Sequence, residues 1–171
     1  MWLDIKEFIK DSIIWILIFL GMFVFIIYVL TFTQVVGPSM EPVLKNKDVV
    51  VVQKLFRKYR RGDIVTHRAG TDQIFIKRII ALEDDKVIIE DGKVFINDQE
   101  LKEDYVLEEN NTKILNREFE VVPKGHYLVL GDNRDNSKDS RDLSIGFIKK
   151  DDITGKVFFK FFPFNRIGIV R

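Results

Sequence analysis

The chain contains no cysteine and only two histidines among its 171 residues. The lack of cysteine excludes disulfide bonds, thiol nucleophiles and thiolate metal sites together. The two histidines, His67 and His126, are too few to favour a zinc site, and we expect neither a metal nor a cofactor. Charge is nearly balanced, with 27 basic and 26 acidic residues, so we expect no nucleic acid as a partner.

Charge is absent from residues 12–40, and the most apolar part of this segment is IIWILIFLGMFVFIIYVLTF, residues 13–32. A helix rises about 1.5 Å per residue, so this run spans the roughly 30 Å hydrocarbon core of a bilayer. A cleaved signal peptide has a shorter apolar region, of about 7–15 residues. We therefore predict an uncleaved transmembrane anchor helix over residues 12–33, behind a short tail of residues 1–11. A buried core helix is the less favoured alternative.

The charges that flank this segment do not decide which end lies in the cytoplasm. Five charged residues of both signs precede it, and a basic set follows it: Lys45, Lys47, Lys54, Arg57, Lys58, Arg60 and Arg61. Simple counting places the C-terminal side in the cytoplasm. That rule applies to short loops, however, because long domains are translocated largely regardless of charge. The residues alone leave the topology open.

The rest of the chain, residues 34–171, has the patterns of β-strands. The sequence KVIIEDGKVFIN, residues 86–97, places Asp-Gly between two alternating runs, which is a strong hairpin signal. Further strands are predicted by apolar and β-branched runs at 48–53, 64–68, 73–82, 126–130 and 153–162. We predict a mainly β domain that is long enough to bury its own core.

A candidate nucleophile, Ser39, follows Gly37 and Pro38 just after the apolar segment. A nucleophile elbow of the G-x-S-x-G type would need glycine at position 41, where Glu41 stands, so an α/β-hydrolase is not favoured. The serine motif of β-lactamases, S-x-x-K, does not occur either. On this stretch alone, a serine in a membrane-proximal turn is the commoner interpretation.

A serine nucleophile needs a base, and the sequence offers two kinds. A triad of Ser39, His126 and Asp132 can be written down, but no spacing favours it. The alternative is Lys77, which interrupts the apolar run IFIKRIIAL. Burial of its ammonium group would lower its pKa and raise the neutral fraction that can act as a base. A lysine that extends from a strand edge into water explains the same pattern equally well.

The stretch GDNRDNSKDSR, residues 131–141, carries six charged side chains between two apolar runs. A calcium loop is excluded because its third, sixth and twelfth positions would be Arg134, Ser137 and Leu143. Alternating carboxylates and guanidinium groups can pair with each other. Such a brace could hold the hydroxyl of Ser137 or of Ser140 at the lysine amine.

Three stretches together resemble the signature boxes of bacterial type I signal peptidases. They are SMEP at 39–42, RGDIV…IFIKRIIAL at 61–82, and GHYLVLGDNRDNSKDSR at 125–141, of which the last is the most specific. The N-terminal anchor and the C-terminal GKVFFKFFPFNRIG are similar to those of the smaller, Gram-positive-like members. The resemblance covers nearly the whole chain except residues 99–117.

The resemblance implies a role for each matching residue. Ser39 is the expected nucleophile, Lys77 the general base, and Ser137 the residue that orients the lysine. The charged loop is expected to support the site through Asp132, Arg134, Asp139 and Arg141. The backbone N–H of Ser39 would be one oxyanion donor. Many members carry a serine at the position of Gly37 as a second donor, so that donor is missing here.

The resemblance also implies the fold and the substrate. The fold is a catalytic domain of coiled antiparallel sheets over residues 34–171, with a smaller variable excursion at 83–122. The substrates are signal peptides of exported preproteins, bound as extended strands with small side chains at the first and third positions before the cut. By position, the shallow pockets for these side chains would be lined by Val35, Val36, Met40, Leu44, Phe75 and Ile76.

The resemblance further implies the placement in the membrane. The N-terminal tail is expected in the cytoplasm and the catalytic domain on the outer side of the cell membrane. The expected partners are signal peptides, the lipid bilayer and the secretion machinery. A C-terminal aromatic set suits the core or the lipid surface equally well, namely Phe158, Phe159, Phe161, Phe162 and Phe164.

Two other functions share some of these features. Self-cleaving repressor-type proteases use the same Ser–Lys chemistry, but they carry regulatory segments where this chain has the apolar run at 13–32. A membrane-anchored β module that only binds partners would not need Ser39 for activity. An inactive homologue would be expected to have lost Ser39, Lys77 or part of the charged loop, and all three are present.

Overall fold

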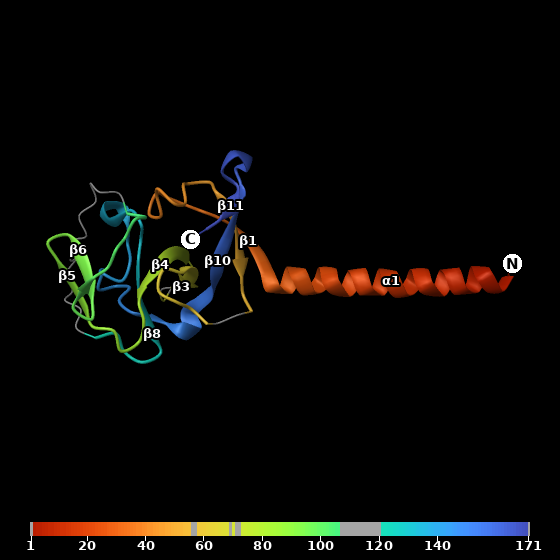
Figure 1. Cartoon of the computed structure of the whole chain (residues 1–171), viewed down its shortest axis with the longest axis horizontal. Coiled ribbons are helices and arrows are strands. Elements are labelled where there is room, and N and C mark those ends of the chain that lie inside the picture. Colours follow the sequence, from red (N-terminus) through yellow and green to blue (C-terminus); the bar gives the residue numbers. More distant parts are fainter. Residues whose placement is uncertain (1, 56–57, 69, 71–72, 107–120, 171) are drawn as a thin grey trace.

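The computed structural model describes residues 2–55, 58–68, 70, 73–106 and 121–170. One long helix, α1 (Trp2–Val29), projects from a β domain as a separate rod (Figure 1). Within the described residues, its segment Ile5–Val29 is the one helix long and apolar enough to cross a membrane, and none of its most apolar window is buried. An apolar helix whose membrane-length window is exposed throughout fits a lipid environment.

The helix spans Trp2–Val29, so the bounds of the predicted anchor helix, residues 12–33, are wrong at both ends: it begins within the predicted tail and ends four residues earlier. Residues Leu30–Gln34 form strand β1, which pairs antiparallel with β2 (Val49–Gln53). The sequence LTFTQ is rich in β-branched and aromatic residues, which favour a strand when a neighbouring strand is available. Hydrophobicity alone did not separate the two elements because both are apolar and free of charge.

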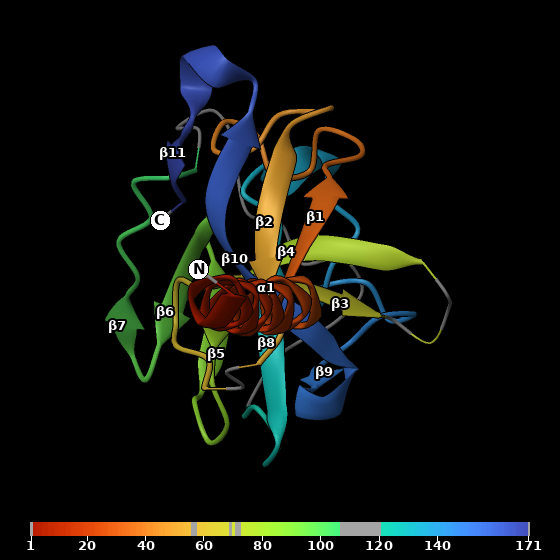
Figure 2. The same ribbon diagram turned by 90° about the vertical axis from the view of Figure 1, so that its right-hand side faces the viewer.

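The main body is an eight-stranded antiparallel sheet in the order β1-β2-β10-β3-β4-β8-β9, with β11 paired to β10. Figure 2, viewed along α1, shows β1, β2 and β10 beside each other. The remaining strands of this sheet are β3 (Ile64–Arg68), β4 (Ile74–Ala81), β8 (His126–Leu130), β9 (Ile148–Lys149), β10 (Ile153–Phe162) and β11 (Gly168–Ile169). Short 3-10 turns occur at Arg134–Asn136, Lys150–Asp152 and Phe164–Arg166. The predicted mainly β architecture is confirmed.

A separate three-stranded sheet consists of β5 (Val87–Glu90), β6 (Lys93–Ile96) and β7 (Gln99–Glu100). It lies at the end of the β domain away from α1 (Figure 1). The predicted hairpin is confirmed: Asp91 and Gly92 both have positive φ, as a two-residue hairpin turn requires. This sheet falls within the predicted excursion 83–122, of which residues 107–120 lie outside the described part.

Strand β4 is the centre of the domain. Its last six residues, Ile76 to Ala81, are all buried, although successive side chains point to opposite faces. The sheet is therefore covered on both sides at this strand. Two consecutive charged residues, Lys77 and Arg78, are buried here on opposite faces. The site described below depends on this placement.

The C-terminal aromatic set is not part of the core. Its side chains are at least one third exposed at Phe158, Phe161, Phe162 and Phe164. Edge-to-face contacts join Phe161 to Phe32 and to Phe164. These rings form an exposed apolar surface on β1, β10 and the following turn.

We predict that Gly155→Ala destabilises the sheet. A Cβ at this position of β10 would lie 2.5 Å from Val52 Cγ1 and 2.8 Å from the Gln53 carbonyl oxygen, so the strands would have to separate. Overpacking of this kind costs about 1–3 kcal/mol of the free energy of unfolding. Urea unfolding followed by circular dichroism measures the change. Gly168→Ala is the matched control, because its Cβ would meet no atom within 4 Å. Equal stability of the two variants would contradict the prediction.

Candidate active site

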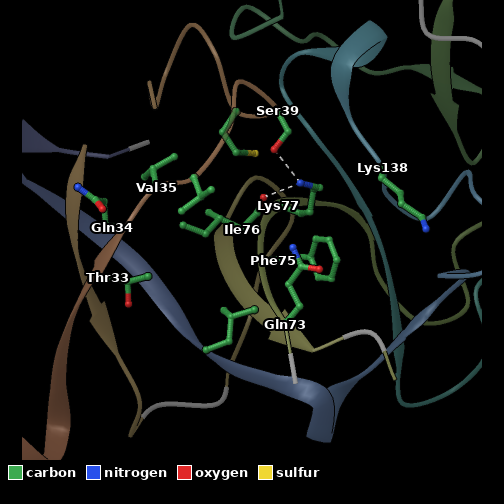
Figure 3. Close-up of a pocket in the computed structure, with 12 residues that line it drawn as sticks. Thr33, Gln34, Val35, Ser39, Gln73, Phe75, Ile76, Lys77 and Lys138 are labelled. Carbon is green, nitrogen blue, oxygen red and sulfur yellow. Dashed lines mark hydrogen bonds between the residues drawn. The ribbon is translucent and has the colours of Figure 1, made fainter. Parts of the chain in front are cut away.

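The structure brings Ser39 and Lys77 together from positions 38 residues apart in the chain. The Lys77 Nζ lies 2.8 Å from the Ser39 Oγ and 3.0 Å from the carbonyl oxygen of Ile76 (Figure 3). Ser39 is half-buried and Lys77 is 3% exposed. A hydroxyl and an amine at this distance have the geometry that a serine nucleophile and its base require.

The loop after β1 places Ser39 by anchoring its neighbours. Gly37 has φ of +86°, in the left-handed region that glycine occupies without strain, which explains the glycine at this position. Met40 and Leu44 are buried in the core, and the Leu44 N–H donates to the Met40 carbonyl oxygen at 2.8 Å. The Ser39 carbonyl oxygen accepts from the Asn133 N–H at 3.1 Å. The backbone of Ser39 is thus bonded directly to the charged loop.

Burial lowers the pKa of Lys77 from its ordinary value of 10.5 to about 8. The cause is desolvation, which disfavours the ammonium form. The charges of Asp139 and Asp132 act in the opposite direction, and the charge of Arg141 acts in the same direction as burial. At pH 8 about half of the Lys77 amines are therefore neutral and able to accept a proton.

Within the charged loop, Asp139 and Arg141 form a buried ion pair. Arg141 donates to both carboxylate oxygens of Asp139, at 2.8 and 2.9 Å, and also to the Arg134 carbonyl oxygen at 2.7 Å. The same carboxylate accepts from the Gly131 N–H at 3.0 Å. These bonds close the loop on itself and fix its backbone beside Lys77.

Asp132 and Arg134 pair with residues outside the loop. Arg78 donates to both carboxylate oxygens of Asp132, at 2.8 and 2.7 Å, on the face of β4 opposite Lys77. Arg134 donates to Glu103 at 2.9 and 2.5 Å. Tyr105 lies over the Arg78 guanidinium at 3.9 Å and donates to Glu103 at 2.7 Å. The network therefore joins β4, the charged loop and the segment after β7.

Sequence reasoning missed three members of this network, namely Arg78, Glu103 and Tyr105. Arg78 did carry a signal, since an arginine inside an apolar strand needs a buried acid as its partner. Glu103 and Tyr105 carried none, because they lie in a polar stretch expected to be a loop. Burial raises the pKa of Tyr105, so its hydroxyl remains a donor.

The two candidate serines of the loop differ in the structure. The Ser140 hydroxyl accepts from the Val129 N–H at 3.0 Å, so it is bonded to the backbone of β8. The Ser137 hydroxyl is buried and has no hydrogen-bond partner among the described residues. A Cβ on Gly131 would lie 2.2 Å from the Ser137 Oγ and 2.5 Å from the Ser39 carbonyl oxygen, so only glycine allows this approach. The role of Ser137 in orienting Lys77 stays a prediction.

The histidine alternative is not assembled. Asp132 is paired with Arg78, and His126 Nδ1 lies 2.8 Å from the Lys124 carbonyl oxygen. Neither residue lines the cavity beside Ser39. His67 is fully buried, and burial lowers its pKa to about 4, so it is neutral.

A cavity of about 200 Å³ opens beside Ser39 and Lys77. It is lined by Thr33, Gln34, Val35, Val36, Ser39, Met40, Gln73, Ile74, Phe75, Ile76, Lys77 and Lys138 (Figure 3). Five of the six residues predicted to form the substrate pocket are in this lining. The exception is Leu44, which is fully buried in the core cluster with Val50 and Ile64 and does not line the cavity. Its side chain points into the core because it anchors the loop that carries Ser39.

Comparison with known proteins identifies the family. A family model described as "Signal peptidase, peptidase S26" matches residues 5–162. The chain belongs to the signal peptidase family. Signal peptidase IB of Staphylococcus aureus is 34% identical over 178 aligned positions, which cover 91% of this chain and 92% of the relative. Signal peptidase I U of Bacillus subtilis is 33% identical, with 95% and 92% covered.

Among solved structures, a signal peptidase I from Enterococcus faecalis is 32% identical in sequence. The match has a TM-score of 0.49 and covers 58% of this chain and 96% of that chain. The sequence relatives show that this chain is a type I signal peptidase, a peptidase that removes signal peptides. The apolar helix of the chain fits a membrane protein. The family match favours this function over the repressor-type protease.

We predict that Lys77→Met stabilises the folded chain below pH 8. Below pH 8 the wild type contains a buried ammonium group, which lowers its free energy of unfolding by about 3 kcal/mol. The substitution removes this cost but also removes hydrogen bonds worth about 1–2 kcal/mol. The folded pKa is the lower one, so wild-type stability recovers as pH rises from about 8 to 10.5 and the gain shrinks. Urea unfolding in detergent at pH 6, 8 and 10 measures the difference in the free energy of unfolding between Lys77→Met and wild type. The exposed Lys149→Met is the control, and a pH-independent difference for Lys77→Met would contradict the prediction.

Proposed function

We propose that the chain cleaves signal peptides from exported preproteins by a Ser39–Lys77 dyad, cutting after small residues. The observation that carries this proposal is the 2.8 Å contact between the Lys77 Nζ and the Ser39 Oγ, made by a lysine whose pKa burial lowers to about 8. A serine is a weak nucleophile until a base removes its proton. Here the amine within hydrogen-bond distance is the one that burial keeps partly neutral.

The reaction takes two steps. In acylation, the neutral Lys77 amine accepts the proton of the Ser39 hydroxyl while its oxygen attacks the scissile carbonyl. The Lys77 ammonium then gives that proton to the nitrogen of the departing mature chain, and the signal peptide stays bound as an ester on Ser39. In deacylation, the Lys77 amine accepts a proton from a water molecule while the water oxygen attacks the ester. The Lys77 ammonium then returns that proton to the Ser39 oxygen as the ester bond breaks. No other proton carrier is needed.

The oxyanion that develops at the scissile carbonyl needs donors. The Ser39 backbone N–H is one donor in this proposal. Gly37 has no side chain to supply a second, and loss of one donor costs about 100- to 1000-fold in the acylation rate. The positive φ of Gly37 gives a structural reason for the glycine, because a serine would be strained in this left-handed conformation.

Specificity for small side chains follows from the size of the cavity. Its volume of about 200 Å³ is shared between the main chain and the side chains of a bound peptide. Val35, Met40 and Ile76 are buried or nearly so and narrow its apolar part. The cavity is lined by the end of β1, at Thr33 and Gln34, and by the start of β4, at 74–76. These strand segments suit a peptide bound as an added strand, whose alternate side chains enter the cavity. We therefore propose alanine at the first and third positions before the cut.

The membrane placement is also proposed here. The N-terminal tail lies in the cytoplasm and the β domain on the outer side, where exported preproteins emerge. The helix end at Val29 precedes Ser39 by ten residues, which favours a site near the bilayer surface. The exposed rings Phe158, Phe161, Phe162 and Phe164 suit contact with lipid. The partners are signal peptides, the bilayer and the secretion machinery.

We predict that Ser39→Ala and Lys77→Ala each abolish cleavage of a preprotein with alanine at the first and third positions before the cut. The first variant lacks the nucleophile and the second lacks its base. Each loss is expected to be at least about 1000-fold in kcat/KM. The assay uses the full-length protein in detergent, with mass spectrometry to locate the cut. Cleavage that survives Lys77→Ala would contradict the dyad, and unchanged cleavage by Ser39→Ala would favour a non-catalytic module.

We predict that the rate of cleavage rises with pH through about 8. The active form has a neutral Lys77, so activity falls about tenfold for each pH unit below that value. Steady-state rates between pH 5 and 10 measure the dependence at constant ionic strength. A rate that stays flat down to pH 5 would exclude Lys77 as the base.

A further inference from the structure

The lining of the cavity carries an unbalanced charge. Among the twelve described residues that line it, Lys77 and Lys138 are basic and none is acidic. Lys77 is occupied with Ser39 and the Ile76 carbonyl oxygen. Lys138 has no part in the chemistry derived above, although it lines the same cavity.

The position of Lys138 is fixed by its neighbours. Ser137 and Asp139 on either side are buried, and Asp139 is held by Arg141 and by the Gly131 N–H. The backbone at 138 is therefore rigid while the Lys138 side chain is exposed. No hydrogen bond or ion pair holds its ammonium group among the described residues. Asp142, a carboxylate close enough to interact with the Lys138 charge, accepts hydrogen bonds from the Ser144 hydroxyl and N–H.

The location of Lys138 relates it to one flank of the substrate. Figure 3 shows Ser39 and Lys77 between Val35 and Ile76 on one side and Lys138 on the other. The apolar side is where the small residues before the cut are proposed to bind. A strand that continues past Ser39 then brings the first residues of the mature chain toward Lys138.

We propose that Lys138 is a specificity-determining residue, which favours preproteins with an acidic side chain at the first or second position of the mature chain. This inference rests on the proposed function. An aspartate there forms an ion pair with the Lys138 ammonium, and none of the described residues that line the cavity carries a competing carboxylate. Because the lysine is exposed, the gain is modest, about two- to five-fold in kcat/KM.

The test compares matched preproteins with aspartate or asparagine at the first or second mature position. Asparagine has nearly the same shape, so the ratio of the two kcat/KM values isolates the charge. Wild type is expected to favour aspartate about two- to five-fold, Lys138→Gln to show a ratio near one, and Lys138→Glu to disfavour aspartate. The exposed Lys149→Gln, outside the cavity, keeps the wild-type ratio. The preference of wild type weakens at 0.5 M salt.

Two results would overturn the inference while leaving the dyad intact. One is an aspartate preference that is unchanged in Lys138→Gln. The other is a Lys138-dependent preference that appears only when aspartate is placed before the cut. If wild type cleaves neither the aspartate nor the asparagine substrate, the proposed function fails and this inference fails with it.

Discussion

The site depends on the desolvation of one ammonium group. Lys77 lies in a strand whose residues are buried on both faces, and burial of its charge lowers its pKa, as the proposed role of base requires. A lysine at the exposed edge of the same sheet would stay charged at neutral pH. The coiled sheet is therefore more than a support for the side chain, because its coverage of both faces sets the proton affinity.

Burial alone does not fix that affinity, because a carboxylate lies nearby. The charge of Asp139 favours the ammonium form of Lys77, and the charge of Arg141 opposes it. Arg141 binds both oxygens of Asp139, and its charge offsets part of the effect of that carboxylate on the lysine. A buried ion pair is weak support for stability because desolvation offsets its attraction. The pair supplies hydrogen bonds to the loop, and the pKa of Lys77 stays lowered beside it because burial is the larger effect.

Much of this arrangement could be predicted from particular residues. The polar interruption of an apolar strand indicated Lys77, and the Asp91-Gly92 pair indicated the hairpin. Local patterns did not reveal that Asp132 pairs with Arg78, or Arg134 with Glu103, because these contacts join positions 54 and 31 residues apart. Leu44 was misassigned to the pocket because a loop has no period from which the direction of a side chain follows. The helix end was misplaced because lipid and a neighbouring strand both accept apolar residues.

The direct passage from α1 into β1 has a consequence for the choice of bond. No flexible linker separates the helix from the sheet, since β1 begins at Leu30, the residue after the helix end. A five-residue strand spans about 17 Å, so the distance between the lipid surface and the cavity is set by a rigid element. The cavity would then lie at a fixed height above the bilayer. In the proposed membrane placement, a peptide bond would be selected by its height above the bilayer as well as by the residues around it.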